Sequence, residues 1–345
     1  MTIINSPAKE IDRNLLSVEA PLEISDNSDA HSTLTAESDG ESSDGASLFS
    51  AASSVFDFVY ENGRRYTNRR DGKYMLPNDE AEEERLNVGH AAFFFMLKGE
   101  LHIAPVYPRR VLDLGTGTGC WAIDMGDLYP DAEIIGTDLS PIQPHFVPPN
   151  VHFEVDDFED EEWGFSEKER FDLIHTRHLV GSVQDWRSFV RKCYDNLQPG
   201  GFLELHETDI VNTYSEDNSI KGSAIEKYSL SLKIAGIKAG RPMHITSELS
   251  SYLEEAGFIN IVVRKTRAPI GTWPKDEFHK QLGEQLREMA LSGLEAYGLA
   301  TFTRVLGWSE DRARELIEDC KRDFMDRKVH TIYPQYFIYA QRPEI

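Results

Sequence analysis

Residues 111–124 read VLDLGTGTGCWAID, and this stretch decides the fold. The apolar residues up to Leu114 predict a buried strand, and Gly115, Gly117 and Gly119 lead from it into a helical segment. Glycine lets the backbone turn tightly and approach a ligand with no Cβ atom in between. The free N–H groups at the start of the next helix can hold an electron-rich group. The stretch therefore predicts a strand, a ligand-binding loop and a helix.

Downstream of this stretch, short apolar strands alternate with helical segments. The predicted strands cover residues 110–114, 133–137, 151–155, 171–175, 202–206, 260–264 and 336–341, and the predicted helices cover 121–128, 186–197 and 246–256. Residues 275–328 predict two or three polar helices inserted before the last strand. Such alternation is typical of a mostly parallel sheet with helices on both faces. The predicted fold class is α/β, with a Rossmann-like, seven-stranded sheet.

A carboxylate ends the second predicted strand, since Asp138 follows Gly115 by 23 positions. This is about the spacing at which an acidic residue accepts both hydroxyls of an adenosine ribose. A dinucleotide site needs a small residue where this chain has Cys120 followed by Trp121, because its helix packs closely over a pyrophosphate. The pattern GxGxG preceded by Asp113 instead favours a cofactor with a charged amino-acid tail and no phosphate.

The N-terminal third divides into two parts. Residues 1–54 are rich in serine and acidic residues, and they predict a disordered tail that cannot bury enough apolar surface to offset its ordering entropy. Residues 55–105 predict a lid segment with a helix whose first turn Asn78 or Asp79 can cap. Within it, residues 66–78 are expected to cover the ligand or to pack on the core. The α/β domain is then expected over residues 106–345.

Composition limits the partners of this chain. A net charge of −23 argues against direct binding to nucleic acid or to an anionic membrane surface, although a basic protein partner remains compatible. The three cysteines are widely separated, and no zinc-type spacing occurs. No signal peptide is evident, and no apolar run reaches the roughly 20 residues needed to span a bilayer. We expect a cytoplasmic location, with a nuclear one as the alternative because of a weak basic patch at Arg64, Arg65, Arg69, Arg70 and Lys73.

Three stretches together resemble the fungal LaeA-type class I methyltransferases of secondary metabolism. They are YENGRRYTNRRDGKYMLPNDEAEEERL (60–86), GTGTGCWAIDMGDLYPDAEIIGTDLSPIQPHFVPPNVHFEVDDFEDEEW (115–163) and FDLIHTRHLVGSVQDWRSFVRKCYDNLQPGGFLELHE (171–207). The resemblance continues more loosely to the C-terminus. It implies S-adenosylmethionine as the cofactor and a small-molecule methyl acceptor.

The resemblance also implies roles for individual residues. Asp113, Gly115, Gly117 and Gly119 would contact the methionine part of the cofactor, Asp138 would bind the ribose, and Leu139 would lie under the adenine. Asp157 would accept from the adenine amino group and Phe158 would supply a backbone contact, with Asp156 as a competitor of Asp157. Residues 176–178 would border the sulfonium and the substrate.

Methyl transfer needs a general base only when the acceptor arrives protonated. The candidate bases are His175, His178, His206, Glu207 and His244, and we favour His178 and Glu207 as catalytic residues. Both follow strands at the carboxyl edge, where open α/β sheets bind their ligands.

Two functions remain open from the sequence. The first is methylation of a small-molecule intermediate in fungal secondary metabolism, and the alternative is a nuclear regulator of secondary-metabolite genes that acts through protein partners. A third reading keeps the fold and the cofactor site without methyl transfer. The acceptor atom and the oligomeric state leave no readable motif.

Overall fold

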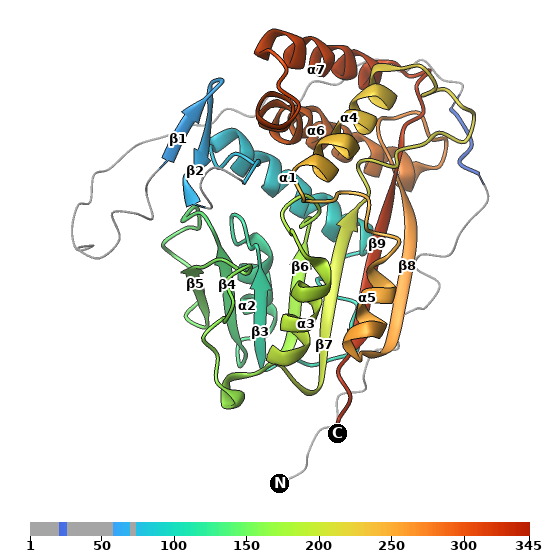
Figure 1. The fold of residues 1–345 in the computed structure, drawn as a ribbon. Coiled ribbons are helices and arrows are strands. Elements are labelled where there is room, and N and C mark those ends of the chain that lie inside the picture. The colour runs from blue at the N-terminus through green and yellow to red at the C-terminus, as the bar shows by residue number, and fades with distance from the viewer. Residues whose placement is uncertain (1–20, 26–57, 70–73) are drawn as a thin grey trace.

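A seven-stranded sheet forms the centre of the computed structural model, which describes residues 21–25, 58–69 and 74–345 (Figure 1). Its strand order is β5-β4-β3-β6-β7-β9-β8. The first five strands of that order are parallel, and β9 runs antiparallel to both β7 and β8. The strands are β3 (Arg110–Leu114), β4 (Glu133–Asp138), β5 (Val151–Val155), β6 (Phe171–Arg177), β7 (Leu197–Thr208), β8 (Ile259–Pro269) and β9 (Ile332–Gln341).

Helices cover both faces of the sheet because its strands are apolar on both sides. Val111 and Leu173 belong to the core cluster with α2 (Cys120–Leu128). Leu112 and Ile174, their neighbours in sequence, belong to the cluster with α3 (Trp186–Asn196) and α5 (Leu249–Ala256). Successive residues of a strand point to opposite faces, so one apolar run serves both layers. A 3-10 turn, η2 (Glu167–Glu169), precedes β6.

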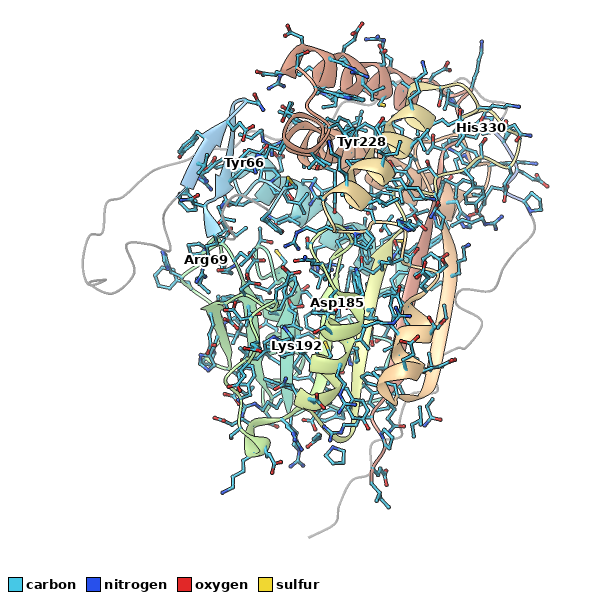
Figure 2. The ribbon with its side chains drawn as sticks, viewed as in Figure 1. Tyr66, Arg69, Asp185, Lys192, Tyr228 and His330 are labelled. Carbon is cyan, nitrogen blue, oxygen red and sulfur yellow. The ribbon has the colours of Figure 1, made fainter. Side chains whose placement is uncertain are left out.

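A helical cap lies beyond the carboxyl ends of the parallel strands. It contains α4 (Ala224–Lys238), α6 (Glu277–Ala300) with the π-helical turn η3 (Thr301–Val305), and α7 (Glu310–Met325) (Figure 1). Between the cap and the sheet runs α1 (Glu80–Met96), whose N-cap Asp79 accepts from the Glu82 amide. Tyr228 lies inside the cap (Figure 2), and its hydroxyl donates to the Leu294 carbonyl at 2.7 Å.

The structure confirms the predicted α/β class and its seven-stranded sheet, with the N-terminal helix and the helical insertion before β9. Two elements were not predicted: α4 and an antiparallel hairpin of β1 (Phe58–Glu61) and β2 (Arg64–Thr67). The hairpin stands where a lid was expected. The predicted disordered tail lies outside the described residues, except for 21–25, where Ile24 pairs with Pro274. No helix of the described chain is long and apolar enough to cross a membrane.

Two glycines of α6 give a matched test of its packing. A Cβ atom at Gly283 would lie 2.1 Å from the backbone oxygen of Gly271, which cannot move freely, whereas at Gly293 the nearest atom is Arg85 Cδ at 3.8 Å. Gly283→Ala is expected to lower the free energy of unfolding by about 1–3 kcal/mol through overpacking. Gly293→Ala should raise it by about 0.5–1 kcal/mol, because alanine favours the helix. Urea denaturation of both variants measures the difference, and similar values for the two would contradict the close approach at Gly283.

Candidate active site

A cleft separates the carboxyl edge of the sheet from the cap. Its two walls come from different parts of the sequence. The glycine loop and the ends of β4 and β6 form one wall. The other wall is formed by α1, α6 and residues 74–78. The sheet side includes Asp113, Gly115, Gly117, Asp138, Leu139, Phe158, His175, Arg177 and His178, and the cap side includes Tyr74, Leu76, Arg85, Leu86, Met289 and Tyr297.

The glycine loop needs glycine for both conformation and space. Gly115, Gly117 and Gly119 have φ angles of 69°, 59° and 80°, in the left-handed region that disfavours side chains. A Cβ atom at Gly115 would lie 2.6 Å from Leu179 Cδ2, and one at Gly119 would lie 2.3 Å from Phe153 Cζ. Substitution in this loop would therefore displace either the cleft wall or the core.

Asp113 is the buried acidic residue that orders the loop. Its Oδ2 accepts from the Thr116 hydroxyl at 2.6 Å, and its Oδ1 accepts from His175 Nδ1 at 2.7 Å. Burial raises the pKa of Asp113 to about 6, although the Thr116 hydrogen bond opposes the shift. The ring of Trp121 stacks on His175 at 3.7 Å between centroids and donates from Nε1 to the Leu101 carbonyl, so Trp121 packs beneath the site.

Asp138 joins the glycine loop to the end of β4. Its Oδ2 accepts from the Gly117 amide and its Oδ1 from the Ser140 amide, both at 2.9 Å. Burial raises the pKa of Asp138, and these two amides oppose the shift. Each carboxylate oxygen has two acceptor positions. Asp138 also lines the cleft, so its remaining acceptor capacity is available to hydroxyl groups of a ligand there.

The residues predicted to contact the adenine divide into two groups. Leu139 and Phe158 line the cleft and are buried. Asp157 directs Oδ1 to the Glu159 amide at 2.8 Å, and Asp156 donates its own amide to the Asp138 carbonyl at 3.0 Å. Neither aspartate is among the residues that line the cleft, so the adenine contact predicted for Asp157 stays a prediction.

His178 lines the cleft at the end of β6 with a positive φ of 58°. Its Nε2 lies 2.8 Å from Thr208 Oγ1, and the Thr208 hydroxyl donates its only hydrogen to Gln335 Oε1 at 2.5 Å. Nε2 must therefore donate, which leaves Nδ1 as the unprotonated nitrogen of a neutral ring. Burial lowers the pKa of His178 well below the usual value, and nearby Arg85 and Arg177 add to this shift.

Glu207 is fully buried and is not among the residues that line the cleft. Its two oxygens accept from the Leu179 and Val180 amides at 2.9 and 3.2 Å. Burial raises the pKa of Glu207 to about 8, and the two amides oppose the shift. This geometry holds the backbone that follows His178. The catalytic role predicted for Glu207 stays untested.

The remaining candidate bases occupy structural positions. His206 is buried and donates from Nε2 to Glu204 Oε1 at 2.6 Å. Burial lowers the pKa of His175 well below its usual value, so this ring is neutral and donates to Asp113. His244 lies in the connection between α4 and α5. The described residues contain no group of three or more His, Cys, Asp or Glu side chains that could hold a metal ion.

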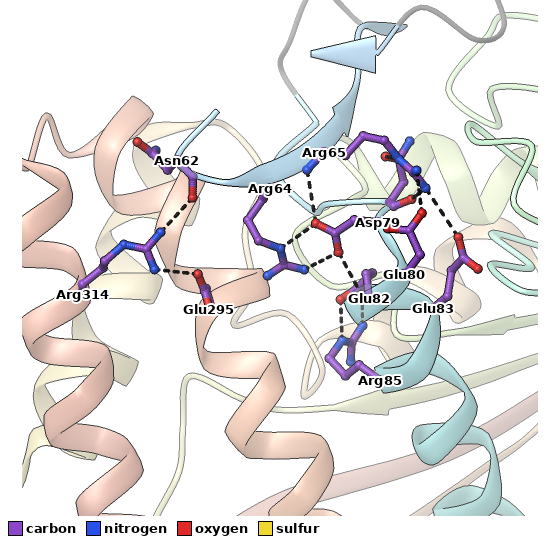
Figure 3. A network of polar contacts seen from close by, with 11 residues as sticks. Asn62, Arg64, Arg65, Asp79, Glu80, Glu82, Glu83, Arg85, Glu295 and Arg314 are labelled. Carbon is purple, nitrogen blue, oxygen red and sulfur yellow. Dashed lines mark hydrogen bonds and ion pairs between the residues drawn. The ribbon is translucent and has the colours of Figure 1, made fainter. Parts of the chain in front are cut away.

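An ion-pair network fastens the cap side of the cleft (Figure 3). Arg64 of β2 makes a bidentate contact with Asp79 at 2.7 and 2.8 Å, and Arg85 makes one with Glu82 at 2.8 and 2.6 Å. Arg65 continues the network to Glu80 and Glu83. Two residues of the predicted basic patch, Arg64 and Arg65, are thus engaged in folding contacts.

The cap wall was not predicted as part of the site. Arg85, Leu86, Met289 and Tyr297 line the cleft from α1 and α6, and no motif in the sequence marks them. The acidic first turn of α1 predicted the helix but not the direction in which it faces.

A family model described as a methyltransferase domain matches residues 60–263. The methyltransferase pytC of Aspergillus terreus is 40% identical over 303 residues, which covers 86% of this chain and 92% of that protein. The secondary metabolism regulator LAE1 of Cochliobolus heterostrophus is 37% identical, covering 82% of this chain and 94% of its own length.

Solved structures with low sequence identity are also similar. The YcgJ protein from Bacillus subtilis matches with a TM-score of 0.42 at 18% identity, over 74% of this chain and all of its own. Phosphoethanolamine N-methyltransferase 2 of Haemonchus contortus matches with a TM-score of 0.42 at 16% identity, over 75% of this chain and 52% of its own. With the family match and the curated relatives taken together, this chain belongs to the LaeA-like family of class I S-adenosylmethionine-dependent methyltransferases.

Proposed function

We propose that this chain transfers a methyl group from S-adenosylmethionine to a small-molecule intermediate of fungal secondary metabolism. The observation that carries the proposal is the two-sided cleft, in which a glycine loop with Asp113 and Asp138 faces an enclosing wall from α1 and α6. The similarity to pytC, a protein named as a methyltransferase, supports the same reading.

The residues present fit the cofactor. Gly115 and Gly117 line the cleft with positive φ angles that disfavour side chains, so the loop presents its backbone to the cleft. Asp138 has acceptor capacity that ribose hydroxyls can use, and Leu139 and Phe158 offer apolar surface that an adenine can contact. Asp113 lines the part of the cleft beside the glycine loop. We assign the ribose to Asp138 and the methionine part to the loop and Asp113.

The bound cofactor supplies a methyl group on a sulfonium, which is already an activated leaving group. The protein then has to orient the acceptor and exclude water, and orientation alone can contribute about 7–11 kcal/mol to lowering the barrier. Arg85, Met289 and Tyr297 enclose the acceptor side. His178 is the residue best placed to receive a proton, because its ring is neutral and Nδ1 is unprotonated.

Glu207 acts on this geometry indirectly in our proposal. It binds the amides of Leu179 and Val180, the two residues that follow His178. We therefore assign Glu207 as a positioning residue for the loop that carries His178 and Leu179 into the cleft.

Regulation of gene expression is the second candidate function. The similarity to LAE1, which is named as a secondary metabolism regulator, favours it. A regulator would act through protein partners, with or without methyl transfer, and in the nucleus. An enzyme and a regulator that binds S-adenosylmethionine would use the same residues of the cleft. The residues of the cofactor site therefore do not separate the two functions.

Calorimetric titration of S-adenosylmethionine tests the cofactor assignment. We expect the purified protein to bind it and Asp138→Ala to bind at least about tenfold more weakly, because hydrogen bonds to a charged group are lost. Asp131→Ala, in the exposed turn before β4, is the matched control and should bind normally. A folded wild-type protein that shows no binding heat would overturn the enzyme proposal.

Gene deletion separates the two candidate functions. For an enzyme, loss of the gene should cause one pathway to accumulate an intermediate that lacks a single methyl group, and purified protein with S-adenosylmethionine should methylate that intermediate. Broad loss of unrelated metabolites, together with nuclear accumulation of a tagged chain, would instead support the regulator.

The buried carboxyl of Glu207 predicts a pH-dependent stability. Since its pKa is about 8 in the folded protein and about 4.3 in an unfolded chain, the folded state holds the proton more tightly. The contribution is fully present below about pH 4.3 and is lost as the pH rises towards 8, by at most about 1.4 kcal/mol per pH unit. Urea denaturation between pH 5 and 8.5 should show the wild type losing stability relative to Glu207→Gln. Parallel profiles for the two proteins would refute the shift.

A further inference from the structure

We infer that Arg177 binds the carboxylate of the amino-acid tail of the cofactor. The inference rests on the proposed use of S-adenosylmethionine and adds to it the residue that recognises the tail. Arg177 ends β6 and lines both the Asp113 end and the Asp138 end of the cleft.

Arg177, which is half-buried at the cleft, differs from the three arginines that the fold buries. Arg64, Arg85 and Arg241 each make a bidentate contact with a carboxylate: Asp79, Glu82 and Glu159 respectively. Such fork-to-fork pairing is how proteins usually satisfy a guanidinium removed from water. Within the described chain, Arg177 makes one hydrogen bond, from a terminal nitrogen to His90 Nδ1 at 3.2 Å. No carboxylate of the described residues makes a hydrogen bond with it.

The surroundings of Arg177 hold its guanidinium in place. It lies 5.3 Å from the centroid of the Phe93 ring, which favours a cation over its face. His90 in turn directs Nε2 to Asp124 at 2.8 Å, so its Nδ1 is the acceptor for Arg177. Two helices, α1 and α2, thus hold the arginine through His90 and Phe93, while Asp113 and Asp124 interact with its charge without a hydrogen bond to it. Because arginine stays protonated in proteins, the charge remains available to a ligand.

A carboxylate is the group that fits this arrangement. The guanidinium fork matches a planar carboxylate bidentately, and a cationic side chain in a cleft with no carboxylate bonded to its fork favours an anion. An amino-acid tail carries both an ammonium and a carboxylate, and this end of the cleft offers both complementary charges in Asp113 and Arg177. The acceptor wall differs, because Arg85 is already paired with Glu82. We therefore assign the carboxylate to the cofactor and not to the acceptor.

Titration of two ligands that differ only in this carboxylate tests the assignment. S-adenosylhomocysteine keeps the charge, and its methyl ester removes the charge but keeps the ammonium. We expect Arg177→Ala to weaken binding of S-adenosylhomocysteine by about tenfold to a hundredfold, and to change binding of the ester by less than about twofold. Arg177→Lys should recover part of the affinity, since it keeps the charge but not the fork. Arg187→Ala, an exposed arginine paired with Glu255, is the control and should match the wild type.

The other outcomes overturn the inference in distinguishable ways. Equal weakening of both ligands would show that Arg177 only shapes the cleft. Unchanged binding of S-adenosylhomocysteine would exclude the cofactor carboxylate, and weakened binding of a carboxylate-bearing acceptor would then identify the acceptor as its partner. If the wild type binds neither S-adenosylhomocysteine nor its ester, the proposed function itself fails, independently of Arg177.

Discussion

The structure depends on one buried row of polar side chains across the middle of the sheet. Strand register places Asp113 beside His175 and His175 beside Glu204, on β3, β6 and β7. Asp113 and His175 bind each other, and Glu204 binds His206 and the amides of residues 103 and 104. Buried polar groups are costly unless paired, and here both carboxylates are paired, whereas His175 Nε2 has no hydrogen-bond partner among the described residues. The Asp113–His175 bond therefore joins β3 to β6 side chain to side chain, and Glu204 ties β7 to residues 103 and 104.

The path of the glycine loop depends on Asp113, a member of this row of polar side chains. Asp113 fixes the end of β3 and binds Thr116, so the chain leaves the strand in one direction. Asp138 holds the next part of the loop through the Gly117 amide. Asp113 and Asp138, from the neighbouring strands β3 and β4, thus hold the loop by hydrogen bonds. Glycine supplies the positive φ angles that this path of the backbone requires. The same carboxylates line the cleft, so the residues that shape the loop also form part of the cleft wall.

Much of the sheet side of the cleft could be predicted from the sequence, because its residues are close together along the chain. Strand, glycine loop, helix and Asp138 all lie within residues 110–138, and period-two apolar strands indicated the layers around them. The hydrogen-bond partners of Glu207 could not be predicted: it lies at the predicted edge of the sheet, and its carboxylate accepts from the backbone amides of Leu179 and Val180. Position along a strand predicts the edge at which a residue lies, whereas its hydrogen-bond partners depend on the path of the next loop.

The cap side of the cleft could not be predicted from the sequence. Its wall combines residues near 85 with residues near 290, and their approach depends on packing between α1 and α6. Ion pairs such as Arg85 with Glu82 leave little net charge on that wall, while Tyr297 and Met289 add apolar surface. On our assignment, the acceptor is recognised on this side by shape and apolar contact, which many sequences can provide. The side that we assign to the cofactor instead uses particular carboxylates and glycines at fixed spacing, which is why related proteins could share the proposed cofactor site while their acceptors or partners differ.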